Sequence, residues 1–195
     1  MIVWINGAFG AGKTQTAHEL RRRIGRGWIS DPELPGFGLH RMMPRALRRN
    51  FQDEPAWRLG VRDVLARLDD HPELSPVIVP MTLVRDDCFD EIVGALRAQG
   101  RRVEHFSLIA SPETIRRRLR SRVHDAWALA QVDGCVRALA SERYATHVDA
   151  DARSIDAVVE EIAARAGLPL VRPRGGRLAS RLRRLGVTLR HVRIG

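Results

Sequence analysis

The sequence contains almost no lysine, because its 33 basic residues are 32 arginines and one lysine, Lys13. It contains only two cysteines, Cys88 and Cys135, which are too few for a disulfide framework and form no C-x-x-C pair. No apolar run reaches the roughly 18 residues that a membrane span needs. The apolar start, Ile2–Ile5, is too short for a signal peptide. These absences predict a protein of the reducing cytoplasm.

Acidic residues are missing from the C-terminal end of the chain. Residues 172–195 contain eight Arg and no Asp or Glu, whereas residues 1–171 contain 25 basic and 23 acidic side chains. Most of the net charge of +10 therefore belongs to the last segment. A chain of 195 residues is long enough for one α/β domain with a sizeable core. We expect a nearly neutral domain over residues 1–171 and a basic tail over residues 172–195.

The chain begins with the pattern of a phosphate-binding P-loop. Ile2–Ile5 is typical of a buried strand, Gly7–Thr14 has the spacing G-x-x-x-x-G-K-[ST], and Gln15–Ile24 has helical periodicity. Glycines allow several backbone N–H groups to point at one phosphate chain, and the helix N-terminus adds a positive partial charge. The predicted nucleotide-binding residues are Gly7, Ala8, Phe9, Gly10, Ala11, Gly12, Lys13, Thr14 and Gln15.

Two residues of the P-loop have predicted chemical roles. Lys13 is a compact positive charge for the β- and γ-phosphates, and the Thr14 hydroxyl is a ligand for Mg²⁺. Because every other basic position is Arg, the single lysine stands where an ammonium group suits phosphate oxygens better than a guanidinium. The alternative is a glycine-rich turn with a solvated lysine. The strand before the loop and the helix after it favour ATP and Mg²⁺ as the cofactors.

Asp31 is the candidate catalytic carboxylate. It follows the second expected strand, Trp28–Ser30, and precedes Pro32. In an open parallel sheet ligands bind at the carboxyl ends of strands, so we expect Asp31 at the same edge as the P-loop. There it can accept a proton from a substrate hydroxyl or hold a Mg²⁺-bound water. The alternative is a turn or helix-capping aspartate, because Asp-Pro is a common turn signal.

Residues 34–60 contain no strand pattern and combine glycine, proline, methionine, arginine and aromatic residues. Small P-loop kinases have a substrate-binding insert at this place, and we expect the same role here. Aromatic side chains can stack on a base, while core packing is the alternative for each of them. Thr82, which follows the third expected strand, can bond to the substrate or act as a cap. The predicted substrate-binding residues are Asp31, Phe37, Arg41, Phe51, Trp57 and Thr82.

An arginine-rich lid is predicted over residues 112–127, where five arginines occur in seven consecutive residues. Arg118 and Arg122 are four residues apart and therefore share one face of a helix. Arginines on a closing lid neutralise charge on a phosphoryl group during transfer, so these two are the candidate catalytic arginines. The alternative is an exposed helix that is rich in arginine, which is our interpretation of Arg116 and Arg120.

Short strands alternate with helices along residues 1–171, which predicts an α/β three-layer sandwich with a five-stranded parallel sheet. By comparison with small kinases we expect the strand order 2-3-1-4-5. The expected strands are 2–5, 28–30, 76–81, 103–110 and 147–149. Beyond the P-loop, the expected helices are 61–68, 86–99, a helix that opens at 111–113, 126–139 and one that is capped by Ser154 and ends at Ala166.

Several segments resemble the tunicamycin-resistance protein family. The longest is Trp4–Ala17, which includes the P-loop, and the resemblance covers nearly the whole chain. It implies a P-loop fold like that of nucleoside kinases, ATP binding, and protection against a uridine-containing nucleoside antibiotic. It also implies a peripheral association with the membrane through the C-terminal segment. The other matching segments are Asp31–Glu33, Val79–Thr82, Glu113 and Thr114 with the following arginines, Gln131–Val136, Ile162–Leu170 and His191–Ile194.

Two functions remain open at this point. The first is an enzyme that transfers the γ-phosphoryl group of ATP to a hydroxyl of a tunicamycin-type antibiotic. Chloramphenicol phosphotransferases, which have a similar layout, use a carboxylate base after the second strand, where Asp31 stands. The second is a protein that binds the antibiotic in the presence of ATP without chemistry. The enzyme is favoured because a binder needs neither Asp31 nor an arginine lid.

The tail has an amphipathic pattern in which apolar residues recur at steps of three and four. Rows of arginine flank this apolar stripe on both sides, which suits a helix lying on an anionic membrane surface. The alternative is that the stripe packs on the domain. Nucleic acid is not an expected partner, because the tail has no aromatic residues to stack on bases. The stripe consists of Leu178, Leu182, Leu185, Leu189 and Val192.

Overall fold

The computed structural model describes residues 1–120 and 126–171. At its centre is a five-stranded parallel sheet with the strand order β2-β3-β1-β4-β5, so the predicted sheet and strand order are confirmed. The predicted catalytic Arg122 and the predicted tail 172–195 lie outside the described residues. The strands are β1 (Ile2–Gly7), β2 (Trp28–Ile29), β3 (Val77–Pro80), β4 (Val103–Ile109) and β5 (His147–Asp149).

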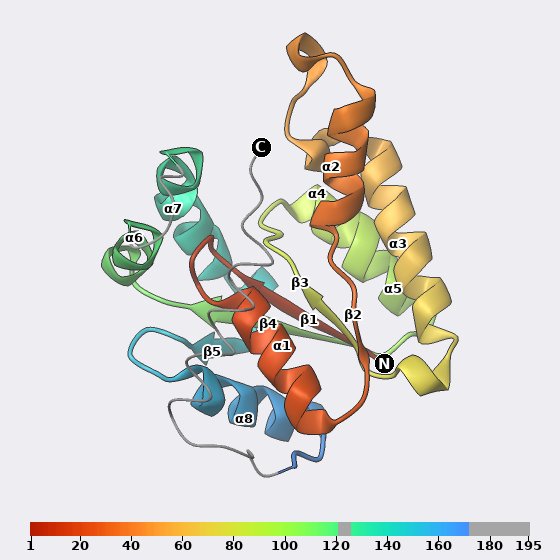
Figure 1. The fold of residues 1–195 in the computed structure, drawn as a ribbon, viewed down its shortest axis with the longest axis vertical. Coiled ribbons are helices and arrows are strands. Elements are labelled where there is room, and N and C mark those ends of the chain that lie inside the picture. Colours follow the sequence, from red (N-terminus) through yellow and green to blue (C-terminus); the bar gives the residue numbers. More distant parts are fainter. Residues whose placement is uncertain (121–125, 172–195) are drawn as a thin grey trace.

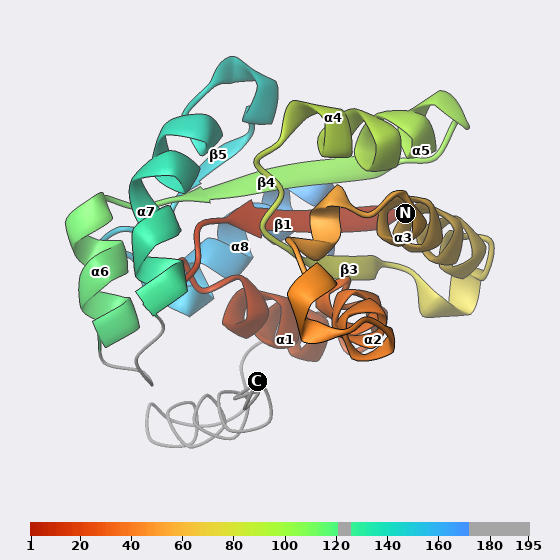
Figure 2. The ribbon, with the colours of Figure 1, turned by 90° about the horizontal axis from the view of Figure 1, so that it is seen from above.

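Helices cover both faces of the sheet, as Figures 1 and 2 show. On one face α1 (Lys13–Ile24) packs beside α8 (Ile155–Ala166). All six residues of β1 are buried because this central strand is covered from both sides. The other face is covered by α3 (Pro55–Asp69), by the helical segment 86–98 and by α7 (Ala126–Leu139).

The local signals in the sequence define several element ends correctly. The hydroxyl of Ser154 accepts a hydrogen bond from the Ala157 N–H, as expected of the cap of α8. The Ser111 hydroxyl accepts one from the Thr114 N–H at 3.3 Å, at the start of α6 (Pro112–Arg120). The predicted limits of α7 and β5 are confirmed.

Two predicted helices differ in the structure. The helix expected over residues 61–68 begins earlier, at Pro55, because proline suits the first helical position and Trp57 adds a buried contact. The helix expected over residues 86–99 is interrupted by a π-helical turn at Asp90–Gly94, which separates α4 (Asp86–Phe89) from α5 (Ala95–Ala98). A single π turn inside a helix leaves no periodicity signal of its own.

The insert expected over residues 34–60 is mainly helical. Its first part lies in α2 (Glu33–Met42), which extends away from the sheet beside α3 in Figure 1. Two short 3-10 helices, Arg45–Leu47 and Phe51–Asp53, connect α2 to α3. Further 3-10 turns lie at Pro72–Leu74 and Glu142–Tyr144.

Candidate functional site

The P-loop connects the end of β1 to the start of α1. Gly10 and Gly12 have φ angles of +84° and +100°, a region that glycine adopts at little cost. A Cβ atom on Gly10 would lie 3.1 Å from the Leu119 side chain of α6. A Cβ atom on Gly12 would lie 3.2 Å from the Ile155 side chain of α8. The loop is therefore packed between α6 and α8 in a conformation suited to present its backbone to a phosphate chain.

Lys13 lies inside this loop rather than in solvent. Lys13 is only 8% exposed, and its Nζ donates to the backbone oxygens of Gly7 at 3.0 Å and Ala8 at 3.1 Å. The ammonium group also lies 5.4 Å from the centre of the Phe9 ring. Thr14 follows in the first turn of α1 and is partly exposed. A solvated lysine in a glycine-rich turn, the alternative interpretation, does not describe this geometry.

Asp31 lies at the start of α2, immediately after β2. Its Oδ1 accepts a hydrogen bond from the Glu33 N–H at 3.0 Å, which is the turn geometry of the alternative interpretation. Because β2, β3 and β1 are parallel neighbours, Asp31 also lies at the strand ends from which the P-loop emerges. The turn fixes the direction of the carboxylate, and this arrangement is compatible with both roles.

Thr82 contacts the P-loop itself. Its residue is 3% exposed, and its hydroxyl donates to the Gly7 carbonyl oxygen at 2.8 Å. Asn6, at the end of β1, reinforces the same junction, because its Oδ1 accepts from the N–H groups of Gly7 and Leu83. The end of β1 and the segment after β3 are thus joined by buried side-chain hydrogen bonds. The Thr82 hydroxyl thus bonds to the P-loop rather than capping a helix, and its contact with a substrate stays a prediction.

A buried histidine adjoins this junction. The Asn6 amide lies 3.2 Å from Nε2 of His105 on β4. Burial lowers the pKa of His105 to about 4, with a smaller contribution from Arg97 in the same direction. The imidazole is therefore neutral at neutral pH. The imidazole also packs edge-on against the Phe89 ring, at 5.0 Å between ring centres, and lies 6.2 Å from the centre of the Tyr144 ring.

The predicted aromatic residues of the insert form one cluster. The Phe51 ring centre lies 5.9 Å from that of Phe37 and 5.4 Å from that of Trp57. Trp57 is 1% exposed and its indole N–H donates to the Pro32 carbonyl at 2.7 Å, which corresponds to the core-packing alternative. Phe37 is partly exposed, and Arg41 is exposed on α2.

The arginine-rich helix α6 contacts the segment that follows β5. Nη2 of Arg118 donates to the carbonyl oxygens of Ala150 and Asp151, at 2.7 and 2.9 Å. Arg116 instead forms an ion pair with Asp133 of α7 at 2.6 Å. Arg118 therefore holds α6 against the β5–α8 connection in this structure, close to the P-loop that α6 also contacts.

Sequence reasoning missed two residues near the loop. Trp127 on α7 is 55% exposed, and its ring centre lies 5.0 Å from that of Phe9 in an edge-on arrangement. Gln52 in the insert is 8% exposed, and its amide donates to the Thr82 carbonyl at 3.0 Å. A single tryptophan or glutamine has no second residue at a motif spacing, so neither position gives a signal in the sequence.

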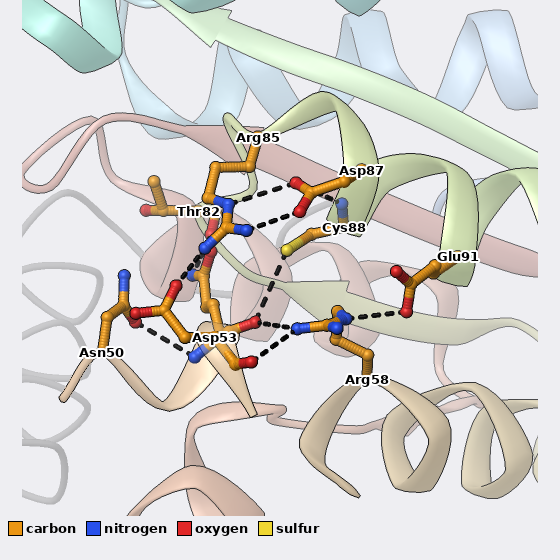
Figure 3. A network of polar contacts seen from close by, with 9 residues as sticks. Asn50, Asp53, Arg58, Thr82, Arg85, Asp87, Cys88 and Glu91 are labelled. Atoms are coloured by element: carbon orange, nitrogen blue, oxygen red, sulfur yellow. Dashed lines mark hydrogen bonds and ion pairs between the residues drawn. The ribbon is translucent and has the colours of Figure 1, made fainter. Parts of the chain in front are cut away.

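Charged residues link the insert to the segment after β3, as Figure 3 shows. The Arg58 Nε donates to Glu91 at 2.7 Å, and Arg85 pairs with both Asp53 and Asp87. The guanidinium of Arg85 lowers the pKa of Asp87 to about 2. Burial raises the pKa of the Cys88 thiol within this network to about 11, so the thiol stays protonated.

In residues 1–120 and 126–171, no cluster of three or more His, Cys, Asp or Glu side chains is arranged to hold a metal ion. Within the same ranges, no helix is both long enough and apolar enough to cross a membrane.

Comparisons with known proteins agree on the type of fold. A protein family described as an AAA domain matches residues 2–147. The tunicamycin resistance protein of Deinococcus radiodurans has 31% sequence identity and a TM-score of 0.75, over 88% of this chain and 99% of that chain. The comparison with curated proteins found no match.

Two kinases of low sequence identity have the same fold. A gluconokinase from Sinorhizobium meliloti has 17% identity and a TM-score of 0.62, over 94% of this chain and 95% of that chain. A shikimate kinase from Bacteroides thetaiotaomicron has 17% identity and a TM-score of 0.57, over 86% of this chain and 99% of that chain. At such identities the likeness shows the fold alone.

Proposed function

Because the chain belongs to the AAA-domain family and to the family of the Deinococcus radiodurans tunicamycin resistance protein, we propose that it is an ATP-dependent phosphotransferase. The proposed acceptor is a hydroxyl of a uridine-containing nucleoside antibiotic of the tunicamycin type. The fold is that of P-loop kinases. The observation that supports transfer most directly is the position of Lys13 inside a glycine-lined loop, at the same sheet edge as Asp31.

The loop fits the phosphate chain of ATP. A Cβ atom at Gly10 or Gly12 would lie 3.1 or 3.2 Å from a side chain of α6 or α8, so glycine leaves room at these positions for a close approach of a phosphate chain to the backbone. The Lys13 ammonium is held at the loop and is a compact donor for the β- and γ-phosphates. Mg²⁺, when bound, neutralises negative charge on these phosphates, and the Thr14 hydroxyl would hold it. The segment 77–84 contains no acidic residue, so this strand end offers no carboxylate for the metal.

Asp31 is the proposed base or orienting group for the acceptor hydroxyl. The partly exposed Phe37 and the exposed Arg41 would contact the acceptor from α2, and Phe51 packs edge-on against Phe37. Trp57 packs against Phe51 and donates to the Pro32 carbonyl, while Thr82 is bonded to the Gly7 carbonyl of the P-loop. These assignments follow from the prediction that the insert 34–60 binds the substrate.

Arg118 and Arg122 are proposed to neutralise the transferred phosphoryl group. Arg118 would first exchange its hydrogen bonds to Ala150 and Asp151 for a phosphate oxygen. Such an exchange is the behaviour expected of a lid over residues 112–127 that closes when substrate binds.

The second candidate function is antibiotic binding in the presence of ATP without chemistry. The hydrogen bond from Glu33 to Asp31 favours it, because this bond gives the carboxylate a structural role. In either case we propose that the protein acts in the cytoplasm, with the tail 172–195 at the inner membrane surface.

Mass spectrometry separates the two functions. The purified protein is incubated with Mg²⁺, ATP and tunicamycin, and the molecular mass of the antibiotic is then measured. An increase of the antibiotic's mass by one phosphate group, with release of ADP, supports the phosphotransferase. An antibiotic of unchanged mass that co-elutes with the protein supports the binder.

Lys13→Ala is the inactive control, because it removes the charge at the phosphates. Arg26→Ala, which removes an exposed cation, is the matched control that should keep full activity.

A further inference from the structure

The carbonyl oxygen of Gly7 accepts two hydrogen bonds from side chains on different elements. Lys13 Nζ donates to it at 3.0 Å and Thr82 Oγ1 at 2.8 Å. Gly7 is itself buried, and both donors are at most 8% exposed. This oxygen is therefore shielded from water and depends on these protein donors.

Lys13 cannot serve the phosphates and keep all its present contacts. An ammonium group has three N–H donors, and two of them already point to the carbonyls of Gly7 and Ala8. Binding both the β- and the γ-phosphate needs two donors, so at least one carbonyl bond must break. A buried carbonyl oxygen that is left without any hydrogen-bond donor lowers the stability of the folded protein. When Lys13 turns away, the Thr82 hydroxyl keeps the Gly7 carbonyl bonded, and the Ala11 N–H keeps the Ala8 carbonyl bonded.

Thr82 is in turn held by the insert. The Gln52 side-chain amide donates to the Thr82 carbonyl at 3.0 Å. Gln52 is fixed through its own backbone, because its carbonyl accepts from Arg58 Nη1 at 2.8 Å and its N–H donates to Asn50 Oδ1 at 3.1 Å. Figure 3 shows these contacts meeting around the short helix Phe51–Asp53.

We propose that Thr82 is a positioning residue of the P-loop and that Gln52 holds it in place. In this relay, Gln52 orders Thr82, Thr82 satisfies the Gly7 carbonyl, and Lys13 is released to the β- and γ-phosphates. The inference rests on the proposed function, since it presumes that ATP binds at the P-loop. It adds a physical connection between the substrate insert and the phosphate site.

Thr82→Val tests the relay, because valine keeps the shape of threonine and removes the hydroxyl. Isothermal titration calorimetry with Mg²⁺ and ATP should show about tenfold weaker binding, the size expected for one unsatisfied buried carbonyl. Binding of AMP should be unchanged, because AMP has no β- or γ-phosphate to draw Lys13 from the carbonyls. Thr82→Ser, which restores the hydroxyl, should recover most of the ATP affinity.

Ser107→Ala is the matched control. Ser107 is fully buried in β4, and its hydroxyl donates to the Tyr144 carbonyl at 2.9 Å. Ser107→Ala loses the same kind of hydrogen bond as Thr82→Val, so both variants should unfold at similarly lowered temperatures. Only Thr82→Val should bind ATP less tightly. Gln52→Met should weaken ATP binding in the same direction by a smaller factor, and it replaces Thr82→Val if that variant is not obtained folded.

The outcomes distinguish a failure of the relay from a failure of the proposed function. If the wild-type protein binds no ATP, the proposed function itself is wrong. If the wild type binds ATP and Thr82→Val binds it equally well, the relay is wrong although the function stands. Equal losses for ATP and AMP would also overturn the relay, because they would indicate a general packing defect rather than a restraint on Lys13.

Discussion

Lys13 shows at the residue scale why one lysine persists in a chain of arginines. Its ammonium fits between the carbonyls of Gly7 and Ala8 with the residue only 8% exposed. A planar guanidinium is larger and needs donors spread over a fork, so it does not fit this narrow space equally well. The amino-acid composition and the geometry of the loop therefore both indicate that position 13 requires lysine rather than arginine.

Asp31→Asn separates the chemical role of this residue from its structural role. Asparagine keeps a side-chain oxygen that can accept the Glu33 N–H, so the turn at the start of α2 should survive. We expect ATP affinity to stay within a few-fold and phosphoryl transfer to fall about a hundredfold, the usual scale for a positioned base. Calorimetry and a coupled ADP-release assay measure the two quantities. A full transfer rate in this variant would show that Asp31 is only a turn residue.

His105 should make the protein sensitive to acid. Its folded-state pKa of about 4 lies below the value of about 6.5 in an unfolded chain. The unfolded state therefore binds more protons between these values, and stability declines as the pH falls from about 6.5 towards 4. The loss from this residue is on the order of 3 kcal/mol.

Urea unfolding at about pH 7 and about pH 4.5 measures this contribution. His105→Gln should lose less stability between the two conditions than the wild type, because glutamine has no proton to bind and its oxygen can accept from Asn6. His71→Gln, the same replacement at an exposed histidine, is the matched control. An identical acid loss in wild type and His105→Gln would refute the assignment.

At the scale of elements, α8 depends on its cap. The Ser154 hydroxyl accepts from the Ala157 N–H, and α8 packs against α1 behind the P-loop. Ser154→Ala should lower the free energy of unfolding by about 1 kcal/mol. Ser141→Ala is the control, because Ser141 also precedes a helical turn but makes no side-chain cap bond. Chemical denaturation compares the two variants, and equal stabilities would argue against the cap.

The segment 86–98 illustrates how an element serves the site indirectly. Its π turn replaces regular α-helical bonding at Asp90–Gly94. The residues before this turn, Asp87 and Cys88, and Glu91 within it contact the insert through Arg85, Gln52 and Arg58. The insert is thus tied to the helical segment that follows β3 (Figure 3).

At the scale of the molecule, the charge imbalance predicts a membrane test. Removing residues 173–195 should release the protein from anionic vesicles while ATP binding survives, because each arginine near an anionic surface contributes about 1 kcal/mol. Sedimentation with such vesicles at low and high salt measures the binding, and high salt should abolish it. The membrane interpretation fails if the full-length protein stays in the supernatant at low salt, or if the truncated chain pellets equally.

The sequence by itself determined the parts of the protein that local chemistry encodes. The P-loop spacing placed Lys13 at the start of α1, and the Ser154 cap located the start of α8. Such features depend on residues three or four positions apart, within reach of one helical turn. The sheet order was predictable only by comparison with kinases, because alternating strands and helices fit several orders.

Only the tertiary structure decided which distant residues share the site. Thr82 bonds to Gly7 across 75 positions of the sequence, Gln52 bonds to Thr82 across 30, and Asn6 contacts His105 across 99. No local pattern encodes these contacts, because they arise when β1, β3 and β4 pair side by side and bring their ends to one edge. The same packing buried Trp57, whose sequence context also allowed an exposed stacking surface.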